Sequence, residues 1–177
     1  PDRGPAMGEQ DPALTPHPYK VYETLEPIPL PTDFPPTTMN ALDAIAGTGD
    51  VAVDEAVPDL AAIARLCLLS NGILKRGSHR SDGTVIEYRA AGGTGARYHL
   101  EFYVICGDLP DLDAGVYHYG AHDHALRRLR VGDFRRELVE ATGAYPAIAD
   151  APVTIVATSM FWRNAWRYQA RAYRHAY

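Results

Sequence analysis

A short glycine-rich loop carries the residues of this chain best suited to hold a ligand. It reads Arg89-Ala90-Ala91-Gly92-Gly93-Thr94-Gly95-Ala96 and lies between two strand-like segments. Glycines let backbone amides approach a ligand closely, and the neighbouring Arg89 could hold a phosphate or polarise a carbonyl group. The loop has neither the Gly-Lys-Ser/Thr of a Walker loop nor the spacing of a dinucleotide fingerprint. A flexible connection between strands explains the same residues equally well.

A second candidate for chemistry is the pair Arg167-Tyr168. A tyrosine beside a cation can have a lowered pKa, which suits it to acid–base work. A hydrolase is disfavoured, because the sequence has no Gly-x-Ser-x-Gly elbow and neither cysteine has an obvious histidine near it. Cys67 and Cys106 each lie in an apolar segment, which predicts buried free thiols in a reducing cytoplasm.

Three histidines, His118, His122 and His124, lie close enough in sequence to suggest a metal site. His122 and His124 would point to the same side of a strand. No carboxylate or cysteine at a fixed spacing completes a zinc site. We therefore interpret the three residues as part of a polar hairpin tip and predict no metal.

Hydrophobic patterning predicts the elements that position these residues. Helices are expected at 38–46, 57–70 and 134–141, and from about 161 onward. Strands are expected at 84–89, 98–106, 115–119, 125–130 and 152–159. Helices and strands without a regular βαβα repeat predict an α+β fold.

The expected last helix has a distinctive layout. One stripe is aromatic and should be buried against a core or a second subunit; it comprises Trp162, Trp166, Ala170, Tyr173 and Tyr177. The stripe beside it comprises Arg163, Arg167, Arg171 and Arg174. These arginines could meet carboxylates or phosphate, and a solvated face is the favoured interpretation. No helix-stop signal precedes Tyr177, so the helix and the fold are expected to continue beyond it.

Residues 1–36 form a proline-rich arm that should be extended over a core or a partner, with disorder expected for residues 1–15. The remaining residues, 37–177, are expected to form a single domain. The formal net charge of −5 argues against a general binder of nucleic acids or anionic membranes. No apolar run approaches the roughly 20 residues that cross a bilayer. A cytoplasmic protein is the resulting expectation.

Four segments, in order, resemble the SagB-type dehydrogenases of the flavin nitroreductase superfamily. HPYKVYETLEPIPLP is similar to the family's arm, and YRAAGGTGARYHLEFYVI is similar to its Arg-x-x-Pro-Ser-Gly-Gly-Ala-Leu-Tyr-Pro-Leu-Glu-Tyr-Val stretch. LDAGVYHYGAHDHALRRLRVGD resembles its Leu-x-x-Gly-Val-Tyr-His-Tyr hairpin, and TSMFWRNAWRYQARAYRHAY resembles its last quoted helix. The resemblance extends over nearly the whole chain beyond about residue 16.

The resemblance implies a nitroreductase-like α+β fold with a mixed sheet flanked by helices, of which residues 37–177 are the front part. It implies a homodimer, or a second chain that completes the domain, with FMN at the interface. It also implies oxidation of azoline rings in peptides, with FMN as hydride acceptor. Arg89 and the loop residues Gly92, Gly93, Thr94 and Gly95 would approach FMN, and Arg167 and Tyr168 would replace the family's catalytic Lys-Tyr pair.

Several positions depart from the family pattern and support a second hypothesis. Gly92-Gly93 stand where the family has Pro-Ser, Arg97 stands for Leu and His99 stands for Pro. Arg167 replaces the catalytic Lys, and an arginine stays protonated and cannot act as a base. The first hypothesis is an FMN-dependent oxidoreductase. The second is a non-catalytic nitroreductase-like subunit that scaffolds an active partner.

Overall fold

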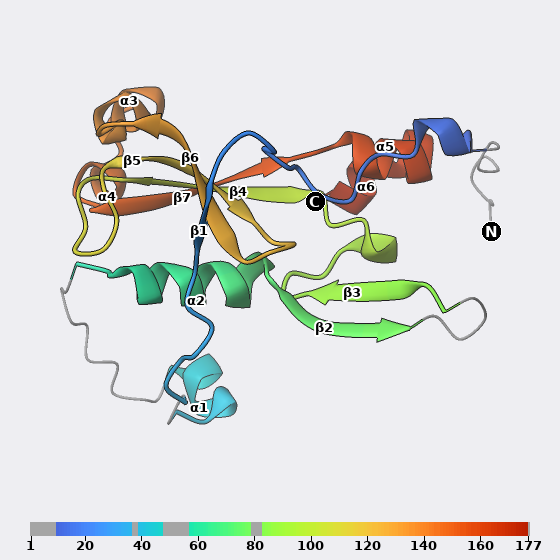
Figure 1. Cartoon of the computed structure of the whole chain (residues 1–177), viewed down its shortest axis with the longest axis horizontal. Coiled ribbons are helices and arrows are strands. Elements are labelled where there is room, and N and C mark those ends of the chain that lie inside the picture. Colours follow the sequence, from blue (N-terminus) through green and yellow to red (C-terminus); the bar gives the residue numbers. More distant parts are fainter. Residues whose placement is uncertain (1–9, 37–38, 48–56, 79–82, 177) are drawn as a thin grey trace.

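The computed structural model describes residues 10–36, 39–47, 57–78 and 83–176. They form a five-stranded sheet with α2 beneath it, further helices at both ends and a two-stranded hairpin beside it (Figure 1). The α+β prediction is therefore confirmed. Every strand pairing within the described ranges is antiparallel, so the sheet in this part of the chain is antiparallel and not mixed.

The sheet has the order β1-β6-β5-β4-β7. Its strands are β1 (Pro27–Pro29), β4 (Leu100–Cys106), β5 (Gly115–Gly120), β6 (Ala125–Val131) and β7 (Val153–Ser159). The predicted bounds of β4 to β7 are confirmed to within two residues. β1 was not expected as a strand; it lies in the proline-rich arm and pairs with β6 at the edge of the sheet, where a residue without an N–H is tolerated.

Alternation along β4 and β5 sends different side chains to the two faces of the sheet. Val104, Tyr117 and Tyr119 are buried in the apolar core. Glu101 and His118 are also buried. Tyr103 pairs with His118, and Glu101 lies on the same side of β4 as Tyr103, so Glu101 and His118 share the opposite face of the sheet. The sheet therefore separates an apolar layer from a layer that contains buried charged and polar groups.

Helix α2 (Leu60–Asn71) covers the apolar face of the sheet (Figure 1). Asp59 caps its first turn by accepting a hydrogen bond from the Ala62 amide at 2.7 Å. One side of the helix, with Ile63, Ala64 and Cys67, is buried in the core. The helix begins after Pro58 and not at residue 57, because Asp59 supplies the cap.

Two strands outside the main sheet, β2 (Ile73–Ser78) and β3 (Val85–Arg89), form the hairpin that leads into the glycine-rich loop. β3 confirms the predicted strand at 84–89, whereas β2 was not predicted. Short helices complete the described chain before the C-terminal segment: α1 (Ala41–Ala46), α3 (Arg135–Ala141) and α4 (Pro146–Ala149). The expected helix at 38–46 begins only at Ala41, and Thr38 lies outside the described residues.

The arm crosses from the end of the sheet near α5, runs over the sheet and descends as β1 toward α1 (Figure 1). The prediction of disorder for residues 1–15 is wrong for its second part. Residues Pro12–Leu14 form a 3-10 helix, η1, capped by Asp11. Gln10 donates a hydrogen bond to the Arg167 carbonyl, and the Asp11 carbonyl accepts one from the Trp166 ring. These two bonds explain why this part of the arm is ordered. Residues 1–9 lie outside the described ranges.

The C-terminal segment is interrupted, which corrects the expected continuous helix. It consists of α5 (Trp162–Tyr168), η3 (Gln169–Arg171) and α6 (Ala172–Ala176). Gln169 has φ +46°, a backbone conformation that ends α5 and redirects the chain. The aromatic stripe is therefore not buried as one face: Trp162 is 50% exposed and Tyr173 is 66% exposed.

Candidate functional site

The glycine-rich loop joins β3 to β4 through the 3-10 turn η2 (Thr94–Ala96). Gly95 has φ +59°, which a glycine adopts without strain. A Cβ atom at Gly95 would collide with the Tyr168 hydroxyl, whereas one at Gly92 would meet open space. The structure thus brings the end of α5, with Tyr168, against the glycine-rich loop.

A pocket of about 350 Å³ opens beside this loop. The arm contributes Pro18 and Tyr19, and the end of β3 contributes Arg89. The loop contributes Gly95 and Tyr98. Of the predicted cofactor-binding residues, Arg89 and Gly95 therefore line one pocket. Gly92 lines a separate small cavity of about 10 Å³, and a Cβ at Gly93 would lie 3.0 Å from the Tyr98 ring.

Arg89 is the buried cation of the pocket, with 7% of its surface exposed. Its guanidinium group lies 4.9 Å from the centre of the Tyr19 ring and 5.3 Å from that of Tyr98. It donates hydrogen bonds to Asn71 Oδ1 at 3.5 Å and to the Pro18 carbonyl at 3.4 Å. Burial lowers the pKa of Arg89 below its ordinary value, although the carboxylate of Glu101 acts in the other direction. Its Nε atom has no hydrogen-bond partner among the described residues.

The side chains of the predicted catalytic pair, Arg167 and Tyr168, point in different directions. Tyr168 faces Gly95, and its ring lies 4.1 Å from that of His175, centre to centre. Arg167 turns instead to the arm and donates a hydrogen bond to Gln10 Oε1 at 2.7 Å. The Gln10 amide in turn donates to the Arg167 carbonyl at 3.2 Å. Tyr168 therefore lies at the loop, whereas Arg167 fastens the start of the arm.

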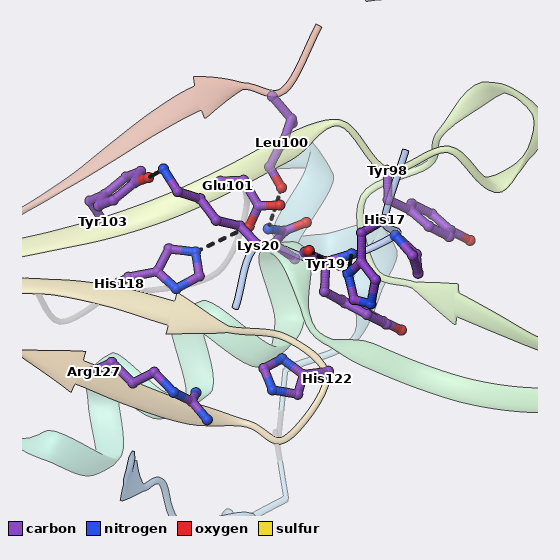
Figure 2. Close-up of polar contacts among 12 residues, drawn as sticks. His17, Tyr19, Lys20, Tyr98, Leu100, Glu101, Tyr103, His118, His122 and Arg127 are labelled. Atoms are coloured by element: carbon purple, nitrogen blue, oxygen red, sulfur yellow. Dashed lines mark hydrogen bonds and ion pairs between the residues drawn. The ribbon is translucent and has the colours of Figure 1, made fainter. Parts of the chain in front are cut away.

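A buried polar cluster next to the pocket was not predicted from the sequence. Glu101 forms an ion pair with Arg163. It also contacts Nε2 of His118 at 3.2 Å (Figure 2). Each of the three side chains is at most 4% exposed. Burial opposes ionisation of Glu101, but His118 and Arg163 outweigh it and hold the pKa of this carboxyl below its ordinary value. The favoured interpretation of the arginine stripe as a solvated face is therefore wrong for Arg163.

One signal in the sequence pointed to this cluster. Glu101 is the single carboxylate within the apolar run YHLEFYVIC. A carboxylate in a buried strand needs a cation and hydrogen-bond donors, because an unpaired buried charge is very costly. The sequence predicts that such a partner exists but does not identify Arg163.

The three histidines considered for a metal site have separate partners. His118 contacts Glu101, His122 lies 3.5 Å from Asp123, and His124 contacts the Tyr119 hydroxyl at 2.9 Å. Within the ranges that the structure describes, no group of three His, Cys, Asp or Glu side chains could hold a metal ion. In the same ranges, no helix has the length and apolar character needed to cross a membrane.

Two solved structures are similar to this chain in fold. No family model matches the chain. The crystal structure of an Anabaena variabilis protein assigned as a nitroreductase covers 96% of this chain with a TM-score of 0.71 and 29% sequence identity. Another such protein, from Ralstonia eutropha, covers 90% of the chain with a TM-score of 0.56 at 18% identity, which supports the fold alone. The fold is nitroreductase-like.

Two curated proteins extend this likeness to sequence. The Trifolitoxin-processing protein TfxB of Rhizobium leguminosarum bv. trifolii is 34% identical over 91 residues, 49% of this chain. A protein of Methanocaldococcus jannaschii assigned as a nitroreductase is 28% identical over 90 residues, 51% of this chain. Together the comparisons support a place in the nitroreductase superfamily.

The chain is short beside most of these relatives. It covers 24% of TfxB, 46% of the M. jannaschii protein and 31% of the A. variabilis chain. Only the R. eutropha chain is covered more fully, at 73%. The activities, substrates and partners of the whole relatives therefore reach this chain only as proposals.

Proposed function

We propose that the chain is part of an FMN-dependent oxidoreductase of the SagB-type branch of the nitroreductase superfamily. The observation that carries this proposal is that Arg89 and Gly95 line one pocket, while the Tyr168 hydroxyl reaches Gly95 from α5. A buried cation, a glycine-rich loop and a hydroxyl group are features that suit a flavin site.

Arg89 at the pocket, and Gly92 in the loop outside it, fit a flavin on two counts. The buried Nε of Arg89 has no partner within the described residues and is suited to an anionic phosphate or a ring carbonyl. The space beside Gly92 is open, so the backbone there is accessible to a ligand. When bound, FMN supplies hydride-accepting chemistry that no side chain offers.

The chain's own contribution would be to bind, orient and handle a proton. Arg89 would hold negative charge, and the packed rings of Tyr19 and Tyr98 would keep its guanidinium group in place. The Tyr168 hydroxyl would accept the proton that the substrate releases as it loses a hydride, while its own hydroxyl proton passes to solvent. Arg167, bonded to Gln10, would act on the arm and not on the substrate.

We further propose that the substrate is a small heterocycle, such as an azoline ring, within a modified peptide. The likeness to a Trifolitoxin-processing protein supports a peptide substrate. Homodimerisation or a second chain would complete the domain, which is consistent with the fraction of the longer relatives that this chain covers.

The test is a visible absorption spectrum of the purified full chain, alone and after titration with FMN, with the intact mass recorded on the same sample. Bound flavin that stays with the protein through gel filtration supports the proposal. Tyr168→Phe should keep the flavin but abolish most turnover of an azoline peptide, with Tyr145→Phe, an exposed tyrosine far from the loop in sequence, as the control. Protein that leaves gel filtration colourless after incubation with saturating FMN contradicts the proposal.

A second candidate, a non-catalytic subunit that scaffolds an active partner, is favoured by a specific observation. Arg97 and Arg167 stand at positions where the family resemblance implies other residues. Both side chains contact other parts of this chain. Arg167 bonds to Gln10, and the Arg97 guanidinium lies 5.1 Å from the centre of the Trp166 ring. A protein without flavin that still forms a stable complex with a flavin-bearing partner would favour this candidate.

A further inference from the structure

Two buried arginines hold two successive carbonyl groups of the arm. Arg163 Nε donates to the His17 carbonyl at 3.0 Å, and Arg89 Nη2 donates to the Pro18 carbonyl at 3.4 Å. One arginine comes from α5 and the other from β3. Charged donors form the stronger class of hydrogen bonds, particularly where water is excluded. The arm is therefore fixed at this point by the interior of the domain.

Arg163 is shared among three segments of the chain. Besides the His17 carbonyl of the arm, it donates to the Tyr98 carbonyl at the end of the glycine-rich loop, at 2.9 Å. Its third partner is the carboxylate of Glu101 on β4. Arg163 is 2% exposed, and Glu101 is itself held by His118. The guanidinium group of Arg163 thus links the arm and the glycine-rich loop to the Glu101 carboxylate on the sheet.

Beyond this point the arm makes further aromatic and polar contacts, of which Figure 2 shows that between Lys20 and Tyr103. The Tyr19 ring packs against the Arg89 guanidinium group, and Lys20 Nζ donates to the Tyr103 hydroxyl at 2.6 Å. The Tyr22 ring meets His118 edge to face, with 5.1 Å between ring centres. Through Pro18 and Tyr19 this stretch lines the pocket, opposite Tyr98 of the loop.

We propose that Arg163 is a positioning residue that clamps arm residues 17–22 and the loop end at Tyr98, so that both form fixed walls of the pocket. The planar fork of a guanidinium group can serve three separated acceptors at once, whereas an ammonium group is a single point charge. The inference rests on the proposed function only for the identity of the pocket's ligand. The clamp itself acts in the chain without any ligand.

The peptide bond between Lys20 and Val21 offers a direct test, because trypsin can cut there only when the arm leaves the sheet. Arg163→Lys keeps a positive charge beside Glu101 but loses the fork. We expect cleavage at Lys20 in the full chain, relative to cleavage within β6 after Arg128, to rise about tenfold or more, the scale of one lost charged hydrogen bond. Fragment masses over a time course give both rates, and no FMN is added.

Arg136→Lys is the matched control, since Arg136 is an exposed helix residue paired with Glu140, and its ratio should equal that of the unchanged protein. The clamp is overturned if Arg163→Lys leaves the ratio of cleavage at Lys20 to cleavage after Arg128 unchanged, or if it accelerates both cleavages equally. If that variant fails to fold, the double variant Glu101→Gln/Arg163→Met removes the ion pair as a whole, so that neither of its two partners is left buried without the other. For the double variant, too, an unchanged ratio or equal acceleration at both sites would contradict the clamp. This test uses no FMN, so its result does not depend on whether the protein binds flavin.

Discussion

The hydroxyl group of Tyr168 lies against the α-carbon of Gly95, so closely that a methyl group there would collide with it. Gly95→Ala should therefore destabilise the protein in two ways. A non-glycine residue at φ +59° costs about 1–2 kcal/mol, and the collision adds about 1–3 kcal/mol. Urea unfolding of the variant measures the sum.

Tyr168→Phe separates the two contributions. Without the hydroxyl, the nearest ring atom would lie 3.6 Å from the new methyl group, an ordinary contact distance. Gly95→Ala should cost less in the Tyr168→Phe background, by at least about 0.5 kcal/mol. Gly92→Ala, where the added methyl group meets open space, is the control and should be nearly neutral. Strictly additive free energies in the Gly95/Tyr168 pair would contradict the packing described.

The buried Glu101 predicts a specific dependence of stability on pH. Its pKa lies below the ordinary value of 4.5, since its partners His118 and Arg163 outweigh the effect of burial. A carboxylate of this kind stabilises the folded chain above its unfolded pKa, and this contribution is lost as the pH falls through the folded pKa. The stability advantage of the unchanged protein over Glu101→Gln should therefore be largest near neutral pH and shrink below about pH 4.5.

Urea unfolding at pH 7 and at pH 4 measures that difference. Glu140→Gln serves as the control, because Glu140 is an exposed partner of Arg136 and its loss should matter little at either pH. A difference between the unchanged protein and Glu101→Gln that is constant from pH 7 to pH 4 would refute the role given to the carboxylate.

The main sheet could be predicted from the sequence because its strands carry their own signals. β4 is a run of aromatic and β-branched residues, and β5 and β6 flank a polar turn. β2 carries no comparable signal, because Lys75, Arg76 and Gly77 interrupt its apolar character. That strand forms only by pairing with β3, and its formation therefore depends on a tertiary contact.

The candidate site divides in the same way. The glycine-rich loop is a local pattern and could be read directly, as could Tyr168 through the family resemblance. The cluster of Glu101, His118 and Arg163 depends on the register of β4 against β5 and on where α5 meets the sheet. A single sequence does not specify that register. The interruption of the C-terminal helix at Gln169 likewise has no neighbouring proline or glycine from which it could be predicted.

The two cysteines should be inert in the folded protein. Cys67 and Cys106 are both fully buried, and burial raises the pKa of the Cys67 thiol to about 12. Since the thiolate is the reactive form, an aromatic disulfide reagent at pH 8 should label neither residue until the chain unfolds. Labelling in the native state should match the rate of global unfolding, whereas labelling in urea should be immediate. Rapid reaction of either thiol without denaturant would contradict the burial.

Arg89 should control flavin affinity if the proposed function holds. Arg89→Met removes the buried charge and its hydrogen bonds but keeps most of the side-chain volume, and FMN affinity should fall about 10–100-fold. Quenching of flavin fluorescence during titration of the assembled protein measures the dissociation constant, and circular dichroism confirms that the variant is folded. Arg76→Met is the control from the same hairpin, since Arg76 is exposed and paired with Glu87, and its affinity should stay within about twofold. Equal affinities of Arg89→Met and the unchanged protein would place the flavin phosphate and ring carbonyls elsewhere, because a charge-assisted contact cannot be removed from a buried site without loss.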